Sequence, residues 1–448
     1  MSELLKKKKN SFLACPEDVQ TAYDYCEGYK VFLDKSKIER FCVEEAVRIA
    51  KDAGFVAFEY GKKYVPGDKI YYVQHGRAVI FAIIGSQPVT DGFNITAAHV
   101  DCPRLDLKQV PLYEDSGIAL MKTHYYGGIR KYQWVTLPLA LCGTVCKRNG
   151  ETIRIDIGND PADPVFYITD LLPHLAKDQK EIGGEDLNII VGSKPDADSE
   201  DQSCKTAVLK LLSEKYGIVE EDFETADLSL VPAGNARDIG LDRSLIAAYG
   251  HDDRICAYPE LTALLALKGI PKKTCVAVFA DREEVGSMGI SGMRCAYVPD
   301  FLKELCGDLN ARQAFANSCA LSADVNAAFD PNYPSVYEKR NSALLNHGVA
   351  ISKYTGSRGK GGCSEAPAEL LAKLFKIFDD NGVRYQTAEL GKVDQGGGGT
   401  VSQFLADHNI LVVDIGVAML SMHAPYEAAG KIDIYHMHKA CVAFYENY

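Results

Sequence analysis

Several short apolar runs in this chain end abruptly at acidic or histidine residues. The clearest is Thr274–Ala280, which continues without a charged residue into Asp281-Arg282-Glu283-Glu284. An apolar run without polar alternation is typical of a strand that is buried on both faces. Helices must then cover both faces of the sheet, so this feature restricts the chain to an α/β architecture.

Other segments follow the same pattern and alternate with helical ones. Apolar runs that predict buried strands lie at residues 78–84, 93–98, Cys319–Ala323 and 410–415. Segments with helical spacing or helix-start residues lie at 36–53, after Asp253, at 366–378 and at 400–406. This alternation favours a mostly parallel sheet sandwiched by helices.

The middle of the chain has a different texture. Residues 144–147 and Thr152–Ile157 flank Asn149-Gly150, a dipeptide typical of a hairpin turn. Residues 178–203 are acidic and predict a solvated loop, with one possible strand at 187–191. We therefore expect one α/β domain, made of residues 1–105 and 241–448, that is interrupted by a β-rich insertion at 106–240.

Charge and cysteine content restrict the partners and the compartment. The 448 residues carry a formal net charge of −12, which argues against a nucleic-acid partner. The basic run Lys6-Lys7-Lys8-Lys9 is typical of a solvated tail. We expect no signal peptide and no membrane span, because the apolar runs are too short. The 14 cysteines include no C-x-x-C pair, so we expect reduced core cysteines and a cytoplasmic protein.

Metal-ligand residue types recur at the ends of the predicted strands, where open α/β sheets build their sites. Each alone has an ordinary explanation, such as a helix cap for an aspartate. Two adjacent glutamates after a buried strand are costly, however, unless a cation or a proton neutralises them. Oxygen and imidazole ligands suit a pair of Zn²⁺, Mn²⁺ or Co²⁺ ions better than Ca²⁺. The residues concerned are His99, Asp101, Asp253, Glu283, Glu284, Asp324 and His423.

Five segments give the chain a resemblance to a known family. In the same order, and over nearly the whole chain, they resemble segments of the metallopeptidases that include aspartyl aminopeptidase and vacuolar-type aminopeptidase I, in the zinc exopeptidase superfamily. The glutamate pair with Val285-Gly286-Ser287 is the most specific. The segments are His99-Val100-Asp101-Cys102-Pro103, Asp253-Arg254, Asp281-Arg282-Glu283-Glu284-Val285-Gly286-Ser287, Ser322-Ala323-Asp324 with Pro331-Asn332-Tyr333, and Ala418-Met419-Leu420-Ser421-Met422-His423.

The resemblance implies a role for each residue. Two divalent ions, zinc first among the candidates, would share Asp253 as a bridging ligand. One ion would also bind His99 and Asp324, and the other would also bind Glu284 and His423. Glu283 would act as the general base, and Asp101 would orient His99.

The resemblance also implies an assembly. Family members carry a β-rich dimerisation domain inside the catalytic domain, which agrees with the insertion at residues 106–240. A histidine of that domain reaches the partner subunit's active site, and Leu172-Pro173-His174-Leu175 matches the element that carries it. His174 is therefore the candidate for polarising the scissile carbonyl in trans. Relatives form closed oligomers, so we expect a homo-oligomer in which dimers assemble into a dodecamer.

The function that we predict is a dinuclear-metal aminopeptidase that acts on peptides with a free N-terminus. Two alternatives remain: a deacylase or blocked-N-terminus hydrolase on the same scaffold, and a non-catalytic binding protein that keeps the fold. Lys353, Arg358 and Lys360 lie where acid-selective relatives place a pocket lysine, but no one of them can be matched to it. The preferred N-terminal residue therefore stays open.

Overall fold

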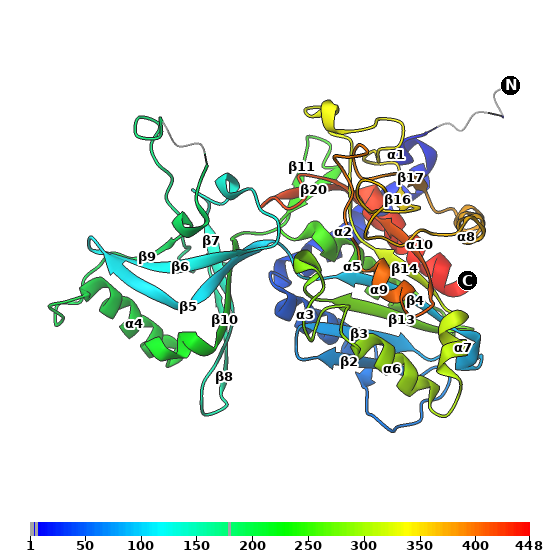
Figure 1. The fold of residues 1–448 in the computed structure, drawn as a ribbon, viewed down its shortest axis with the longest axis horizontal. Helices are drawn as coiled ribbons and strands as arrows, with labels where there is room; N and C mark the ends of the chain where they lie inside the picture. Colours follow the sequence, from blue (N-terminus) through cyan, green and yellow to red (C-terminus); the bar gives the residue numbers. More distant parts are fainter. Residues whose placement is uncertain (1–3, 5–7, 178–180) are drawn as a thin grey trace. The chain divides into compact units, whose positions relative to one another are not determined.

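A computed structural model describes residue 4, residues 8–177 and residues 181–448 (Figure 1). Internal contacts divide the chain into two units. The first unit comprises Met1–Asp101, Ala236–Met422 and Glu427–Tyr448, and the second comprises Cys102–Asn235 and His423–Tyr426. Lys6 and Lys7 of the basic run, and residues 178–180 of the predicted loop, lie outside the described residues.

A nine-stranded sheet forms the centre of the first unit, in the order β1-β2-β3-β13-β4-β14-β18-β16-β17. Its central neighbours β13, β4, β14 and β18 are parallel, whereas β3 pairs antiparallel with both β2 and β13, and β16 pairs antiparallel with β18. The predicted α/β class is confirmed in this form, as a large mixed sheet. The strands are β1 (Val56–Ala57), β2 (Lys69–Gln74), β3 (Ala78–Ile83), β4 (Phe93–His99), β13 (Thr274–Ala280), β14 (Cys319–Ala323), β16 (Val349–Ser352), β17 (Tyr385–Thr387) and β18 (Leu411–Gly416).

Helices cover both faces of this sheet because its strands are apolar on both faces. On β3, Val79 and Phe81 belong to one core cluster, and Ile80 and Ala82 belong to the other. The first cluster is completed by α2 (Val19–Lys35), α3 (Glu39–Asp52), α5 (His251–Ala266), α8 (Ala368–Asp380) and α10 (Lys431–Asn447). The second is completed by α6 (Tyr297–Cys306), α7 (Ala311–Ala316) and α9 (Ser402–Ala406). The short α1 (Ser11–Ala14) precedes α2.

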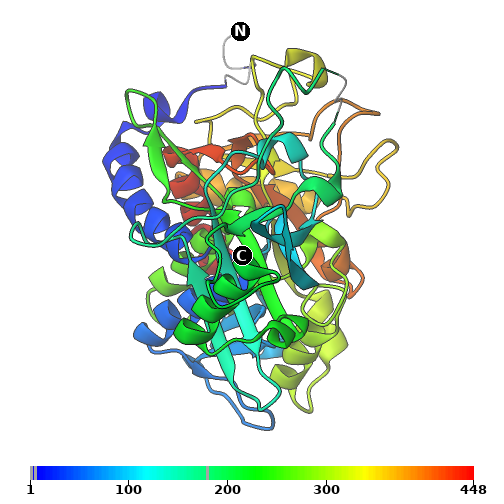
Figure 2. The same ribbon diagram turned by 90° about the vertical axis from the view of Figure 1, so that its left-hand side faces the viewer.

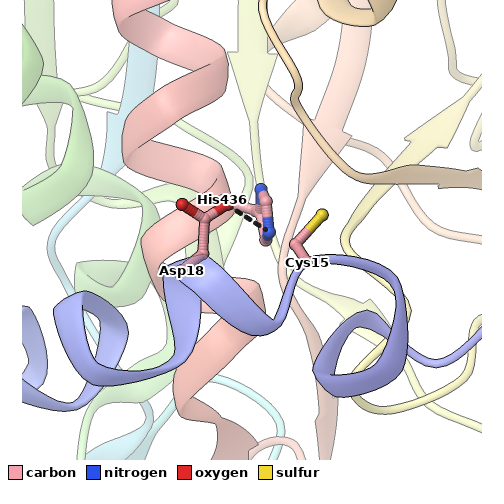
Figure 3. A group of neighbouring side chains, drawn as sticks. All are labelled: Cys15, Asp18 and His436. Atoms are coloured by element: carbon pink, nitrogen blue, oxygen red, sulfur yellow. Dashed lines mark ion pairs between the residues drawn. The ribbon is translucent and has the colours of Figure 1, made fainter.

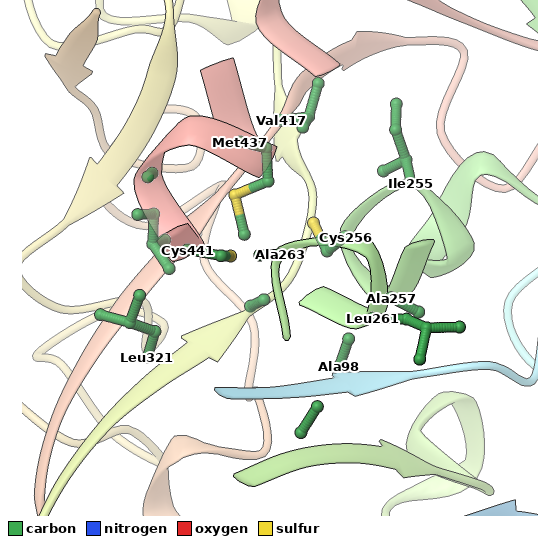
Figure 4. Packing of buried hydrophobic residues seen from close by; sticks show 14 of the residues in the cluster. Ala98, Ile255, Cys256, Ala257, Leu261, Ala263, Leu321, Val417, Met437 and Cys441 are labelled. Carbon is green, nitrogen blue, oxygen red and sulfur yellow. The ribbon is translucent and has the colours of Figure 1, made fainter. Parts of the chain in front are cut away.

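Small side chains allow α5 and α10 to pack closely on the sheet. Figure 4 shows Cys256 and Ala263 of α5 beside Met437 and Cys441 of α10, above Ala98 of β4. A five-stranded sheet, in the order β11-β12-β20-β19-β15, completes the first unit. Its strands are β11 (Arg237–Ile239), β12 (Leu245–Ala248), β15 (Asn326–Ala327), β19 (Ala418–Leu420) and β20 (Glu427–Gly430).

The second unit is a six-stranded sheet in the order β8-β7-β10-β5-β6-β9, with a helix packed on it. The helix α4 (Ser203–Tyr216) contacts β5, β6 and β9, and Figure 2 shows it lying across the strands. The predicted hairpin is confirmed, since β7 and β8 pair antiparallel around Asn149-Gly150. The strands are β5 (Arg104–Asp115), β6 (Ile118–Tyr126), β7 (Leu139–Cys146), β8 (Thr152–Ile157), β9 (Ile189–Gly192) and β10 (Ala226–Pro232).

None of the helices among the described residues combines the length and the apolar character that a membrane crossing requires.

Candidate metal centre

The carboxyl ends of three neighbouring strands bring together residues that are far apart in the sequence. β13, β4 and β14 are parallel, with His99 opposite Ala280, so the side chains that follow these strands gather at one edge of the sheet. His99 ends β4, and Asp324 directly follows β14. Glu283 and Glu284 lie in a single 3₁₀ turn after β13.

His99 belongs to two groups of possible metal ligands. Its Nε2 lies 3.1 Å from Asp252 Oδ1 and 3.9 Å from Asp324 Oδ1. One group joins His99 with Asp252 and Glu284, and the other joins it with Asp253 and Asp324. Within each group, one ligand atom from each residue lies within 4.8 Å of the others. Imidazole and carboxylate donors are thus concentrated in one small volume.

Asp101 links His99 to the glutamate turn. His99 Nδ1 bonds to the Asp101 backbone carbonyl at 2.9 Å, and the Asp101 carboxylate lies 3.5 Å from the same nitrogen. A carbonyl can only accept, so Nδ1 carries a proton, and Nε2 is the nitrogen that faces the acids and can bind a cation in place of its own proton. The buried Asp101 carboxylate accepts the backbone N–H groups of Glu283 and Glu284 at 3.1 and 3.2 Å. One side chain therefore fixes both the histidine and the turn.

The start of α5 supplies Asp252 and Asp253. Glu427 Oε2 accepts the Asp252 backbone N–H at 3.2 Å. The buried Arg254 donates from Nε to the Val100 carbonyl at 3.1 Å, which ties α5 to the end of β4. Asp253 is completely buried, and neither of its carboxylate oxygens receives a hydrogen bond of good geometry from the described residues.

These acids repel one another in the absence of a cation. Burial raises the pKa of Asp253, and the nearby Asp324 raises it further. Burial also raises the pKa of Asp324; His99 opposes this shift and Glu283 adds to it. Burial disfavours the charged His99 ring, but Asp101 and Asp252 outweigh that effect and raise its pKa. Buried carboxylates that lie this close together fit a site for divalent cations, which would neutralise them.

Comparison with known proteins decides the family. The model of the family described as Aminopeptidase I zinc metalloprotease (M18) matches residues 32–445. The chain belongs to the M18 aminopeptidase family. A probable M18 family aminopeptidase 1 of Clostridium acetobutylicum is 48% identical to this chain, and the alignment covers 100% of both sequences.

Solved structures of M18 proteins agree with this assignment. The crystal structure of the M18 aminopeptidase from Thermotoga maritima matches with a TM-score of 0.95 at 40% identity, over 99% of this chain and 100% of that one. Aminopeptidase I from C. acetobutylicum matches with a TM-score of 0.92 at 46% identity, over the same shares of the two chains. An S. cerevisiae mApe1 dodecamer shares the fold, with a TM-score of 0.78 at 21% identity over 95% and 97% of the two chains. This chain is therefore a metallo-aminopeptidase, which hydrolyses the N-terminal peptide bond of peptides.

The predicted site residues of this M18 chain fall in two places. His99, Asp101, Asp253, Glu283, Glu284 and Asp324 all lie in the first unit, around the edge described above. His423 and His174 lie in the second unit. There, His423 Nδ1 bonds to the Gly128 carbonyl at 2.9 Å, and His174 is exposed in a turn. The roles of these two histidines stay predictions.

Asp252 and Glu427 also belong to this M18 site, although the sequence motifs did not single them out. Asp252 is adjacent to Asp253, and the spacing of apolar residues does not indicate which of the two acids faces Glu284. Glu427 acts on a backbone amide 175 positions away, so it belongs to no local motif. The orientation of each depends on the backbone at the start of α5.

The two groups that share His99 are together called the His99 group. Another set of ligand-type side chains, called the second group, lies away from this edge and consists of Cys15, Asp18 and His436 (Figure 3). Its geometry argues against a metal. The Arg384 backbone N–H donates to His436 Nδ1 at 3.2 Å, so the ring's lone pair is already used and Nε2 carries the proton. Lys439 Nζ lies 2.8 Å from Asp18 Oδ2 and neutralises it. Burial lowers the pKa of His436 to about 4, which keeps the ring uncharged.

Proposed function

We propose that this M18 aminopeptidase holds two divalent cations, with Zn²⁺ as the first candidate and Mn²⁺ or Co²⁺ as alternatives, around His99. The observation that carries the proposal is the pair of ligand groups that share this histidine. His99 and Asp324 would bind one ion, and Glu284 would bind the other. On its sequence motif alone, His423 is proposed as a further ligand of the second ion.

The shared ligand is better assigned to Asp252 than to Asp253. A bridging carboxylate must lie near ligands of both ions, and Asp252 groups with His99 on one side and Glu284 on the other. Asp253 groups with His99 and Asp324 only, which belong to a single ion in this scheme. We therefore propose Asp252 as the bridge, with Asp253 as a buried carboxylate behind it. The family resemblance implied the bridging role for Asp253 instead.

The proton transfers of hydrolysis are proposed to depend on the chain's own side chains. When bound, divalent cations lower the pKa of water and polarise the peptide carbonyl. Glu283 is proposed to take the proton of the attacking water and to pass it to the leaving amine. Its side chain is partly exposed, and its backbone is held by Asp101, so it can face the substrate from a fixed position. Glu284, one residue on, has one carboxylate oxygen buried and is proposed as a ligand.

The second unit is proposed to dimerise and to place His174 in the partner's site. His174 lies among exposed apolar side chains: Leu171, Leu172 and Leu175 are 44%, 49% and 68% exposed. Apolar exposure of this kind favours an interface with a second copy. The mApe1 dodecamer, which has the same fold, supports assembly beyond the dimer. Free thiols at all 14 cysteines suit the cytoplasm as the proposed compartment.

The proposed chemistry is tested by substrate choice and metal content together. The purified protein is depleted with a chelator, reloaded with Zn²⁺, Mn²⁺ or Co²⁺, and assayed on aminoacyl-p-nitroanilides and on their N-acylated counterparts. We expect hydrolysis of the free-amine series only, with activity that saturates near two ions per chain. Cleavage of only the blocked series, or saturation at one ion, would contradict the proposal.

A further inference from the structure

Glu427 is a buried acid beside the proposed metal ligands, and no sequence motif includes it. Only 2% of the residue is exposed. It begins β20 and lies opposite Ala248, the last residue of β12. Four residues beyond Ala248 the chain reaches Asp252, whose backbone N–H donates to Glu427 Oε2 at 3.2 Å. A further negative charge in an acid-rich site is costly, so its presence needs a reason.

The start of α5 provides that reason. The first amides of a helix have no intrahelical partner and are usually satisfied by a side chain at the N-cap. Here the N-cap is Gly250, with no capping side chain in the described structure, and Asp252 and Asp253 have non-helical φ/ψ angles. The Asp252 amide therefore depends on an acceptor from elsewhere in the chain. Glu427 supplies it from β20.

We infer that Glu427 is a positioning residue: through the Asp252 amide, it fixes the direction in which the Asp252 carboxylate faces His99 and Glu284. This inference rests on the ligand role proposed for Asp252. Asp252 Oδ1 already lies 3.1 Å from His99 Nε2. A rotation of this backbone would move the carboxylate away from one of the two ligand groups. Outer residues that orient a ligand typically change metal affinity by about 10–100-fold.

Two variants of nearly equal shape separate the hydrogen bond from the charge. Glu427→Gln keeps an oxygen acceptor without the charge, and Glu427→Met keeps the length without an acceptor. Zn²⁺ affinity of the chelator-depleted protein is measured by competition with a coloured chelator. We expect Glu427→Met to bind about 10–100-fold more weakly and Glu427→Gln to stay within about threefold of the wild type. Asp433→Asn, which removes another buried acid that accepts backbone amides, is the matched control and should not change affinity.

Other results would overturn the inference. Equal weakening in Glu427→Gln and Glu427→Met would make the charge, and not the hydrogen bond, responsible. Wild-type affinity in Glu427→Met would show that Asp252 needs no such support. If Glu427→Met does not fold, Glu427→Ala takes its place, and faster amide hydrogen exchange in a peptide containing Asp252 is then required. Asp252→Asn is measured in parallel: wild-type affinity there contradicts the proposed function itself.

Discussion

Two groups of ligand-type side chains in this chain differ in one hydrogen bond to a histidine. At His99, Nδ1 donates to the Asp101 carbonyl, so Nε2, which faces the carboxylates, can exchange its proton for a cation. At His436, Nδ1 accepts the Arg384 amide, which leaves a proton on Nε2. The second group also has Lys439 beside its acid, whereas Asp253 in the first has no hydrogen-bond donor of good geometry among the described residues. Residue types alone do not distinguish such groups; hydrogen-bond direction and charge balance do.

The largest expected effect separates chemistry from binding within the His99 group. Glu283→Gln should lower kcat by about 10²–10⁴-fold, because the amide cannot carry a proton between water and the leaving amine. Metal content should stay near the wild-type value, since Glu283 is not a proposed ligand. Steady-state kinetics with elemental analysis of the same sample measures both. Loss of metal in this variant would mean that Glu283 and Glu284 have exchanged roles.

Next in size is the effect of removing one acid from each group. Asp252→Asn should weaken Zn²⁺ binding by more than the roughly 100-fold that outer residues reach. Asp253→Asn should weaken it less, because Asp253 is proposed to lie behind the ligands. Asp18→Asn, the matched change in the second group, should leave affinity unchanged. Competition with a chelator measures all three, and a larger loss for Asp253 than for Asp252 would return the bridging role to Asp253.

The sheet and the strand-end residues could be predicted because they follow local rules. A strand buried on both faces is a continuous apolar run, and the residue after it is at the sheet edge. The helix α10 has no such signature, since it contacts α2, α5, α8 and β16 and is therefore buried around much of its surface. Amphipathic spacing is absent from a helix of that kind. Asp252 and Glu427 escaped prediction for a different reason: their roles depend on an irregular helix start.

A smaller effect is the opposite pH dependence of stability in the two groups. Asp253 has a raised pKa in the folded, metal-free protein, so the folded state binds more protons than the unfolded state above the ordinary value of about 3.9. The free energy of unfolding of the metal-free protein should therefore fall as the pH rises from about 3.9 toward the raised pKa of Asp253. His436 has a folded pKa of about 4, below its ordinary value of about 6.5. Its contribution to the free energy of unfolding should therefore rise with pH between these two values.

Urea unfolding of the chelated protein at a series of pH values tests this contrast. Asp253→Asn should reduce the loss of stability at higher pH, and His436→Gln should reduce the gain between about pH 4 and 6.5. Each pKa unit corresponds to about 1.4 kcal/mol. Added Zn²⁺ should stabilise the wild type more at pH 7.5 than at pH 5, because it binds ionised carboxylates. Identical pH profiles for Asp253→Asn and the wild type would refute the assignment.

The smallest expected effect is none at all, at Cys15. A thiolate would be the strongest zinc ligand of the second group, so Cys15→Ser is the most sensitive test of whether that group binds metal. Burial raises the pKa of the Cys15 thiol, and the proton on His436 Nε2 blocks the neighbouring ligand position. Metal content, affinity and the spectrum of the Co²⁺-loaded protein should therefore match those of the wild type. A thiolate-to-Co²⁺ charge-transfer band that disappears in Cys15→Ser would show that His436 can release its Nε2 proton. Hydrogen-bond direction would then not suffice to tell the two groups apart.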